Sequence, residues 1–263
     1  MNPTIELLLN RKSVRAYTGQ PVSEVEKETI LQAALRAPTA GNMMLYSVIE
    51  VADQALKDRL VLTCDDQPFI AKAPYVLLFV ADYQRWFDYY LAGGVEKLCR
   101  ERNLVMRCPQ EGDLLLACCD TLIAAHSAVI AAEALGIGSC YIGDILERYE
   151  IHAEMFALPR YVLPVILVCF GYPTPGQAAR KQTPRFAKEF IVHQNSYHHL
   201  DHDELERMLQ PRNEQYLASA NRQAGIENVG QFNYFKKFSA DFSVEMSRSV
   251  RKMIQNWSEG DTG

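Results

Sequence analysis

One segment, residues 112–135, constrains the fold of this chain more than any other. Its sequence, GDLLLACCDTLIAAHSAVIAAEAL, is apolar on nearly every side at helical spacing, and Gly136 follows it. A helix that is apolar all round is buried in the middle of a fold. We therefore expect one long core helix around which the other elements pack.

Shorter elements alternate around this segment. Ser23 and Glu26 form a capping box that begins a helix ending near Pro38, and a second helix is expected over 53–62. Apolar runs predict buried strands, and Pro164 in the last of them must lie at a strand start or an edge. The expected strands are 46–51, 75–81, 139–144 (broken at Gly143) and 161–173. Interleaved helices and strands predict an α+β domain with a central sheet.

The bulk composition is that of an ordinary soluble protein, with 48% hydrophobic and 22% charged residues among 263. With a net charge of −5, the chain has no excess of basic residues that would indicate binding to nucleic acid or an anionic membrane. No signal peptide is expected, and runs such as 75–81 are too short to span a bilayer. Seven cysteines without a CxxC pair suit a cytoplasmic protein whose thiols, Cys118 and Cys119 among them, are reduced and buried.

Residues 11–15, RKSVR, gather cations around a hydroxyl in an acidic protein. In an extended segment, Arg11, Ser13 and Arg15 project to one side, as two guanidinium groups and a hydroxyl at a phosphate site do. The alternative is a solvated helix end with cations near its C-terminal dipole. A second basic stretch at 180–185 favours a phosphate site built from both regions. No GxGxxG follows a strand, so a Rossmann site is not supported.

Six motifs in order carry a resemblance to a known family. RKSVRAY, APTAGNMM, QPFIAKAP, AAHSAVIAAEALGIGSCYIGDI, VCFGYP and TPRF resemble the FMN-dependent nitroreductase family over about residues 5–200. The match is closest to its larger branch of NAD(P)H nitroreductases and flavin reductases. The resemblance implies a dimeric three-layer fold whose central, mainly antiparallel sheet is flanked by helices.

The resemblance also implies the FMN ligands. Arg11 and Ser13 match positions that hold the phosphate, and Arg15 matches a cation near the pyrimidine ring and ribityl chain. Backbone N–H groups of Gly143 and Asp144 match positions near flavin N5, although relatives often have glycine where Asp144 stands, which leaves open which N–H faces N5. The remaining residues implied to bind the cofactor are Lys12, Thr39, Asn42, Met43, Gln67, Tyr141, Ile142, Lys181, Thr183 and Arg185. Of these, the loop from Thr39 to Met43 is implied to reach a flavin through the dimer interface.

The implied reaction is a ping-pong transfer. NADPH or NADH gives hydride to flavin N5 and leaves, and a small aromatic, nitroaromatic, quinone or flavin acceptor replaces it. Both substrates use the flavin ring itself, so no acid or base side chain is named as catalytic. A family arginine for the NADPH phosphate corresponds to a position near Ser219; Arg212 or Arg222 are the substitutes, and the choice between NADH and NADPH stays open.

Two regions outside the motifs are assigned by composition. Residues 83–108 lie where a substrate lid is expected, and their aromatic side chains either stack on an acceptor or pack under the helix: Trp86, Phe87, Tyr89 and Tyr90. Residues 201–263 are polar with only a thin apolar stripe. We expect them to be a helical extension that wraps a dimer, because one subunit leaves that stripe unburied, while residues 1–200 form the FMN-binding domain.

Two alternatives remain at this stage. Either the chain is an FMN-binding or sensing protein without committed turnover, or it performs a specialised reaction such as reductive dehalogenation. The histidine-rich stretch with His193, His198, His199 and His202 is interpreted as a polar linker, and no metal is expected.

Overall fold

The computed structural model describes residues 2–220 and 222–258, which form two compact units. One unit joins the chain up to residue 181 with residues from 245 onward; the other is residues 182–244. This division differs from the expected one (1–200 and 201–263) in two ways: residues 182–200 belong to the second unit, and the last helix, from residue 245 onward, belongs to the first. The wrapping of a dimer by residues 201–263 stays a prediction, and residues 259–263 lie outside the described residues.

An antiparallel sheet of four strands, in the order β1-β2-β4-β3, forms the centre of the first unit. The register pairs Val48 with Phe79 across β1 and β2, and Cys140 with Cys169 across β3 and β4. The strands are β1 (Tyr46–Glu50), β2 (Tyr75–Asp82), β3 (Gly138–Ile142) and β4 (Val162–Gly171). All four expected strands are confirmed, with no boundary shifted by more than two residues.

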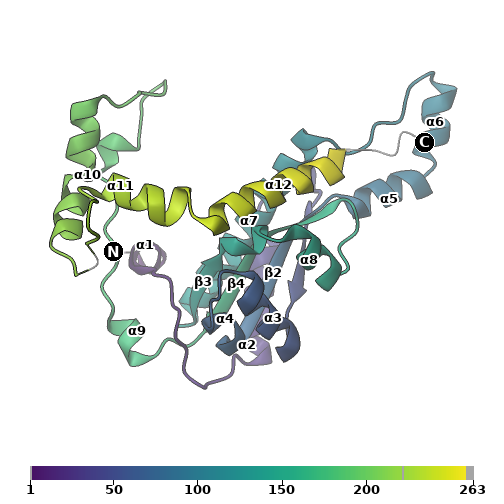
Figure 1. Ribbon diagram of the computed structural model, residues 1–263. Coiled ribbons are helices and arrows are strands. Elements are labelled where there is room, and N and C mark those ends of the chain that lie inside the picture. The colour runs from purple at the N-terminus through teal and green to yellow at the C-terminus, as the bar shows by residue number, and fades with distance from the viewer. Residues whose placement is uncertain (1, 221, 259–263) are drawn as a thin grey trace. The chain divides into compact units, whose positions relative to one another are not determined.

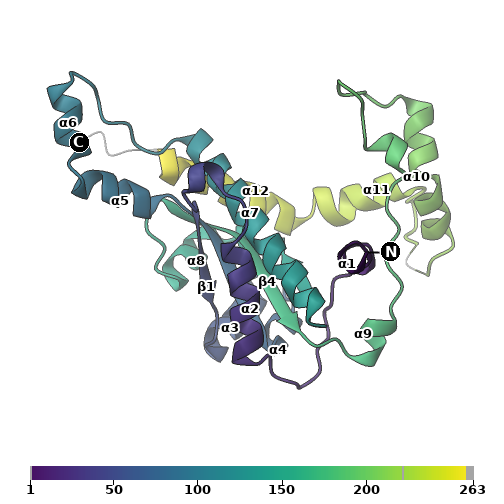
Figure 2. The same ribbon diagram turned by 180° about the vertical axis from the view of Figure 1, so that it is seen from behind.

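Helices cover both faces of this sheet, which makes three layers (Figure 1; Figure 2). On one face, α2 (Glu24–Leu35) and α7 (Glu111–Ala134) pack over alternate residues of β2 such as Leu77 and Phe79. On the other face, α3 (Gln54–Thr63) and α4 (Phe69–Lys72) cover Leu78 and Val80. Because both faces are covered, every residue of β2 is buried. The expected three-layer α+β arrangement is confirmed.

The core helix α7 is buried on one side only. Small residues such as Ala124, Ala128 and Ala132 are fully buried against the sheet and α2. The opposite side presents exposed apolar side chains to solvent: Leu115, Leu116, Leu122 and Ile123, with Leu115 68% exposed. The expectation of burial all round is therefore wrong for this side, and Cys119 is likewise exposed. By length and composition α7 is also apolar enough to cross a membrane, a property that core helices share.

Pro164 lies in an interior strand, which the sequence alone disfavours. It is the third residue of β4 and pairs with Val80 of β2 at a register shift between Phe79 and Val80. The partner strand on its other side, β3, pairs with β4 only from Leu167 to Gly171. At Pro164 the strand is therefore an edge on that side, and the missing N–H breaks no ladder there.

The last helix, α12 (Asp241–Ser258), returns to the first unit with its residues from Glu245 onward. Ser249, Met253 and Trp257, four residues apart, are its buried stripe. Trp257 is fully buried; its indole N–H donates to Gln110 O at 3.0 Å, and its ring lies 5.5 Å from that of Tyr161. For this helix the expectation that one subunit leaves the stripe unburied is wrong.

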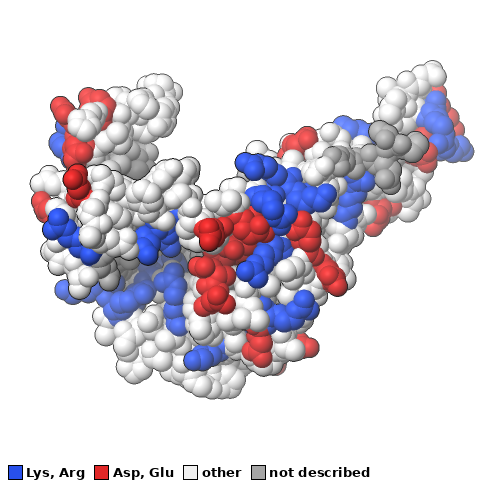
Figure 3. All heavy atoms as spheres, viewed as in Figure 1, with Lys and Arg blue, Asp and Glu red and all other residues white. Residues whose placement is uncertain are grey.

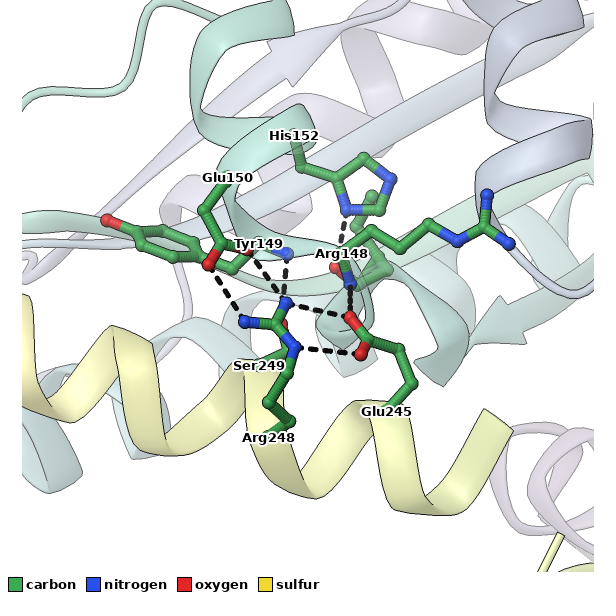
Figure 4. Close-up of polar contacts among 8 residues, drawn as sticks. Arg148, Tyr149, Glu150, His152, Glu245, Arg248 and Ser249 are labelled. Atoms are coloured by element: carbon green, nitrogen blue, oxygen red, sulfur yellow. Dashed lines mark hydrogen bonds and ion pairs between the residues drawn. The ribbon is translucent and has the colours of Figure 1, made fainter. Parts of the chain in front are cut away.

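Polar contacts hold the other end of α12 against α8 (Tyr149–Met155) (Figure 4). Arg248 donates two hydrogen bonds of 2.8 Å to the Glu150 carboxylate and also pairs with Glu245. Glu245 accepts from the backbone N–H of Arg148, and Ser249 Oγ accepts from that of Tyr149 at 2.9 Å. Acidic and basic side chains are correspondingly mixed where α12 crosses the first unit (Figure 3).

The remaining elements connect or extend these layers. In the expected lid region, Trp86 and Phe87 pack against the core beside Tyr161, whereas Tyr89 is exposed. The first unit also contains α1 (Pro3–Asn10), η1 (Ala40–Asn42), α5 (Gln84–Ala92), α6 (Val95–Glu101), η2 (Gly143–Leu146) and α9 (Pro175–Ala179). The second unit holds η3 (Lys188–Phe190), α10 (His202–Leu217), α11 (Val229–Asn233) and η4, a π-helix (Tyr234–Phe238).

Substituting Trp257 tests the docking of α12. We expect Trp257→Ala to lower the free energy of unfolding by about 3–5 kcal/mol, because it opens a cavity in the core. Ile254→Ala on the same helix is the control; this side chain is 39% exposed, so its loss costs much less. Urea unfolding of the full chain measures both. Equal losses for the two variants would show that α12 does not dock through Trp257.

Candidate functional site

The basic segment at residues 11–15 lies along β3 rather than in solvent. Ser13 forms a parallel bridge with Ser139, and the N–H of Val14 donates to Ser139 O at 2.8 Å. This approach requires glycine at position 138, because a Cβ there would lie 2.5 Å from a Val14 methyl group. Val14 is buried, so the segment is fixed between its charged residues.

The guanidinium groups of Arg11 and Arg15 lie beside Cys140 and Tyr141 of β3. The Arg11 guanidinium lies 6.0 Å from the centre of the Tyr141 ring. Burial raises the pKa of Cys140, while Arg15 and Arg11 oppose this by their charge. Two guanidinium groups therefore face one short stretch of strand, as the one-sided projection of residues 11, 13 and 15 predicts. Their roles toward FMN remain predictions.

Lys12 is used differently from its neighbours. Its ammonium donates to the carbonyl oxygens of Ala178 and Arg180, the latter at 2.8 Å, at the end of α9. Arg180 in turn donates to Ser13 O, and Gln177 Oε1 accepts from the Arg15 N–H. These bonds fasten α9 to the N-terminal segment, beside which basic side chains gather in Figure 3. Lys12 thus has a structural task in addition to its predicted contact with the phosphate.

The other residues predicted at the phosphate, Lys181, Thr183 and Arg185, follow α9 in the sequence. Lys181 ends the first unit, and Thr183 and Arg185 belong to the second. Their part in an FMN phosphate site therefore stays a prediction. Within the second unit, Thr183, Arg212 and Ser219 line one cavity of about 340 Å³, and the Arg212 guanidinium stacks 3.8 Å from the centre of the Phe186 ring. Of the two predicted substitutes for the NADPH arginine, Arg212 is the one that lines this cavity.

Strand β3 ends in the turn that the sequence predicts at flavin N5. The 3-10 helix η2 begins at Gly143, and a Cβ built on Gly143 meets no atom within 4 Å, so the backbone is open to a ligand. Asp144 Oδ2 accepts a hydrogen bond of 2.7 Å from the Gln67 amide. Gln67 and Asp144, 77 residues apart, are thus brought together. Ile142 is buried, so its side chain belongs to the core.

The Thr39–Met43 loop is organised by a residue that the motif reading missed, Asp120 of α7. Its buried carboxylate accepts from Thr39 Oγ1, from the Ala40 N–H at 3.0 Å and from the Leu45 N–H at 3.3 Å. The available signal was an acid between Leu114 and Ala132 of α7, a stretch with no other Asp, Glu, Lys or Arg. With Asp120 as its anchor, the loop holds left-handed backbone at Gly41 and Asn42.

The loop and the Arg11 segment contact different parts of α7. Asp120 holds the loop, whereas Arg11 faces Glu133. Burial raises the pKa of Glu133, and the Arg11 charge only partly opposes this. Thirteen residues separate these positions, about 20 Å at the rise of an α-helix. Within one chain, the two groups of predicted FMN ligands therefore lie apart.

Replacing Asp120 tests the loop anchor. We expect Asp120→Ala to cost at least about 2 kcal/mol of unfolding free energy, because several donors lose their acceptor. Amide hydrogen exchange at Ala40 and Leu45 should accelerate. Asp88→Ala, which removes an exposed carboxylate of α5 bonded to Gln84, is the control. Unchanged exchange at both amides in Asp120→Ala would contradict the assignment.

Comparison with known proteins identifies the family of this chain. The model of the nitroreductase family matches residues 8–172. An oxygen-insensitive NADPH nitroreductase of Salmonella typhimurium is 33% identical over 82% of this chain and 84% of its own. An FMN reductase [NAD(P)H] of Bacillus subtilis is 30% identical over 97% of both chains. The solved structure of NfrA2 from B. megaterium superposes with a TM-score of 0.77 at 26% identity, covering 99% of this chain and 100% of its own. The chain belongs to the nitroreductase family.

Proposed function

We propose that this protein is an FMN-dependent oxidoreductase that takes electrons from NAD(P)H and reduces nitroaromatics, quinones or flavins. The observation that carries the proposal is the alignment of Arg11, Ser13 and Arg15 along β3, next to the open turn at Gly143. The relatives named as an NADPH nitroreductase and an FMN reductase support the same activity.

The residues present fit FMN by their chemistry. Guanidinium groups bind phosphate oxygens through paired N–H donors, and the Ser13 hydroxyl adds another donor. The space over Gly143 suits a flat ring that approaches the backbone closely. When bound, FMN supplies the hydride acceptor and donor for both halves of the reaction.

Different side chains would then bind different parts of FMN. Arg11 and Ser13 hold the phosphate, and Arg15 places a positive charge beside the pyrimidine ring, where negative charge collects on reduction. The Gln67 amide, whose nitrogen donates to Asp144 Oδ2 and to Cys64 O, would bind the pyrimidine edge. For the nucleotide donor, the cavity with Arg212 offers a guanidinium to a phosphate, which favours NADPH.

A homodimer completes this site. The exposed apolar side of α7 is a surface that a soluble chain covers, and a second copy of α7 is the covering we propose. The loop held by Asp120 and the segment at Arg11 lie about 20 Å apart along α7, so a flavin bound by both draws them from two chains. We place the enzyme in the cytoplasm, in keeping with its reduced cysteines.

The division of roles between Arg11 and Arg15 is testable. Arg11→Ala removes a charge-assisted contact of roughly 1.5–3 kcal/mol, so FMN affinity should fall about ten- to a hundred-fold with little change in midpoint potential. Arg15→Ala should make the midpoint potential more negative and slow hydride uptake at saturating FMN. Arg36→Ala, which removes an exposed charge at the end of α2, should change neither. Protein that is colourless and takes up no added FMN would refute the proposed function.

The dimer is tested by a charge placed on the apolar side of α7. We expect Leu122→Glu to give monomers that lose FMN, because a carboxylate is desolvated in the interface. Leu62→Glu on α3, where the side chain is 62% exposed, introduces the same charge outside this side and should stay dimeric. Sedimentation velocity and the flavin content of each species provide the measurement. A dimeric, flavin-loaded Leu122→Glu variant would rule out this interface.

A further inference from the structure

Glu147 is a buried acid that the proposed reaction does not use. It follows η2 directly, three residues after Asp144, and is only 4% exposed. Its Oε1 atom is shielded from solvent and has no hydrogen-bond partner within the part of the chain that the structure describes. Burying an ionised carboxylate without compensating hydrogen bonds is costly, whereas a neutral carboxylic acid is tolerated.

The groups around Glu147 add to this cost. Carboxylates face it from η2, from the connection between α3 and α4, and from α12; one cation and one imidazole lie on the α8 side. These groups are Asp144, Asp65, Glu245, Arg148 and His152, and the Cys64 thiol at the end of α3 also faces Glu147; burial raises the pKa of this thiol to about 12, so it carries no charge. Burial lowers the pKa of His152 to about 4, so this imidazole is neutral at pH 7 and offers no compensating charge. Burial and the like charges outweigh Arg148 and raise the pKa of Glu147 to about 7.

Glu147 is also coupled to the turn that faces the predicted flavin. Its backbone N–H donates to Asp144 O at 3.0 Å, and the Asp144 side chain accepts from Gln67 at 2.7 Å. A change of charge on Glu147 therefore acts directly behind Asp144 and Gly143. When two neighbouring carboxyl groups lie in such different environments, one commonly keeps its proton while the other is ionised.

We propose that Glu147 is a positioning residue that holds a proton below neutral pH as the neutral partner of Asp144, and that releasing this proton as the pH rises through neutrality makes bound FMN harder to reduce. The proton leaves the carboxyl group for solvent and leaves a second negative charge behind the turn. Negative charge there opposes the electron density that reduction adds to the ring. The effect on FMN rests on the proposed function; the proton held by Glu147 does not.

The proton is tested by infrared spectroscopy on the protein as purified. As the pH rises through about 7, the wild type should lose a carboxylic-acid C=O band that Glu147→Gln lacks. Glu154→Gln, which removes an exposed carboxylate of α8, should keep this transition. Asp65→Asn should move it to lower pH, because one like charge is gone; asparagine tolerates the left-handed backbone at this position (φ 57°). A wild type without the band, or with a band that persists in Glu147→Gln, overturns the proposal.

Stability provides a second readout that needs no flavin. The pKa of Glu147 is about 7 in the folded chain and near 4.5 when unfolded, so folding binds the proton more tightly. The stabilisation is complete below about pH 4.5, declines as the pH rises, and is lost once the pH has passed about 7. The unfolding temperature of Glu147→Gln should therefore rise relative to that of the wild type as the pH is raised from acidic to alkaline values. A constant difference between them contradicts a titrating Glu147.

Coupling to FMN is tested by the midpoint potential as a function of pH. In the wild type and Glu154→Gln, the potential should fall more steeply above about pH 7 than it does in Glu147→Gln. Parallel curves, together with a titrating infrared band, would refute the coupling while leaving the proton assigned. A chain that binds no FMN would refute the proposed function, and the infrared and stability results would then still decide whether Glu147 holds the proton.

Discussion

The approach of Val14 to Gly138 is the contact on which the candidate site depends. A Cβ at position 138 would overlap the Val14 side chain, so the N-terminal segment reaches β3 only because that strand begins with glycine. With Val14 buried and Ser13 bridged to Ser139, the residues on either side lose their freedom to turn away. The charged side chains at 11 and 15 are then held beside β3 by backbone contacts, before any ligand is present. Such preorganisation reduces what a bound phosphate must order.

Helix α7 connects this arrangement to the rest of the fold because its sides differ. Alanines on one side allow close packing against α2 and the sheet, and Asp120 on that side binds the loop at Thr39. The other side keeps leucine and isoleucine in solvent within one chain. A helix built in this way supports the sheet from inside and offers a surface for a second copy.

Helix α12, from the other end of the chain, also helps to fix the candidate site. Trp257 is buried between Tyr161 and the start of α7, while Arg248 and Glu245 hold the backbone and carboxylate at residues 148–150. These residues follow η2 almost directly. The segment that carries Gly143, Asp144 and Glu147 is thereby fixed at both ends, by β3 before it and by α12 after it.

The sequence by itself determined the elements and their layers. Alternation, helical spacing and the Ser23–Glu26 capping box are local signals, and they placed the strands and the two helices that cover the sheet with α7. The six motifs, in their order along the chain, also identified the family, because each is a short segment that can be recognised in the sequence alone. Burial of β2 on both faces followed from its uninterrupted apolar run.

Tertiary structure alone decided how these segments use their side chains. The bonds of Lys12 to α9, of Asp120 to the loop and of Gln67 to Asp144 join residues about 80 to 170 positions apart, and no local pattern encodes such partners. The burial of α12 on its own chain and the exposed side of α7 depend on which surfaces meet. Composition describes an apolar stripe, but whether the stripe faces its own chain or solvent is a property of three-dimensional packing. For the same reason Glu147 was invisible in the sequence, since its protonation depends on carboxylates that only folding brings to it.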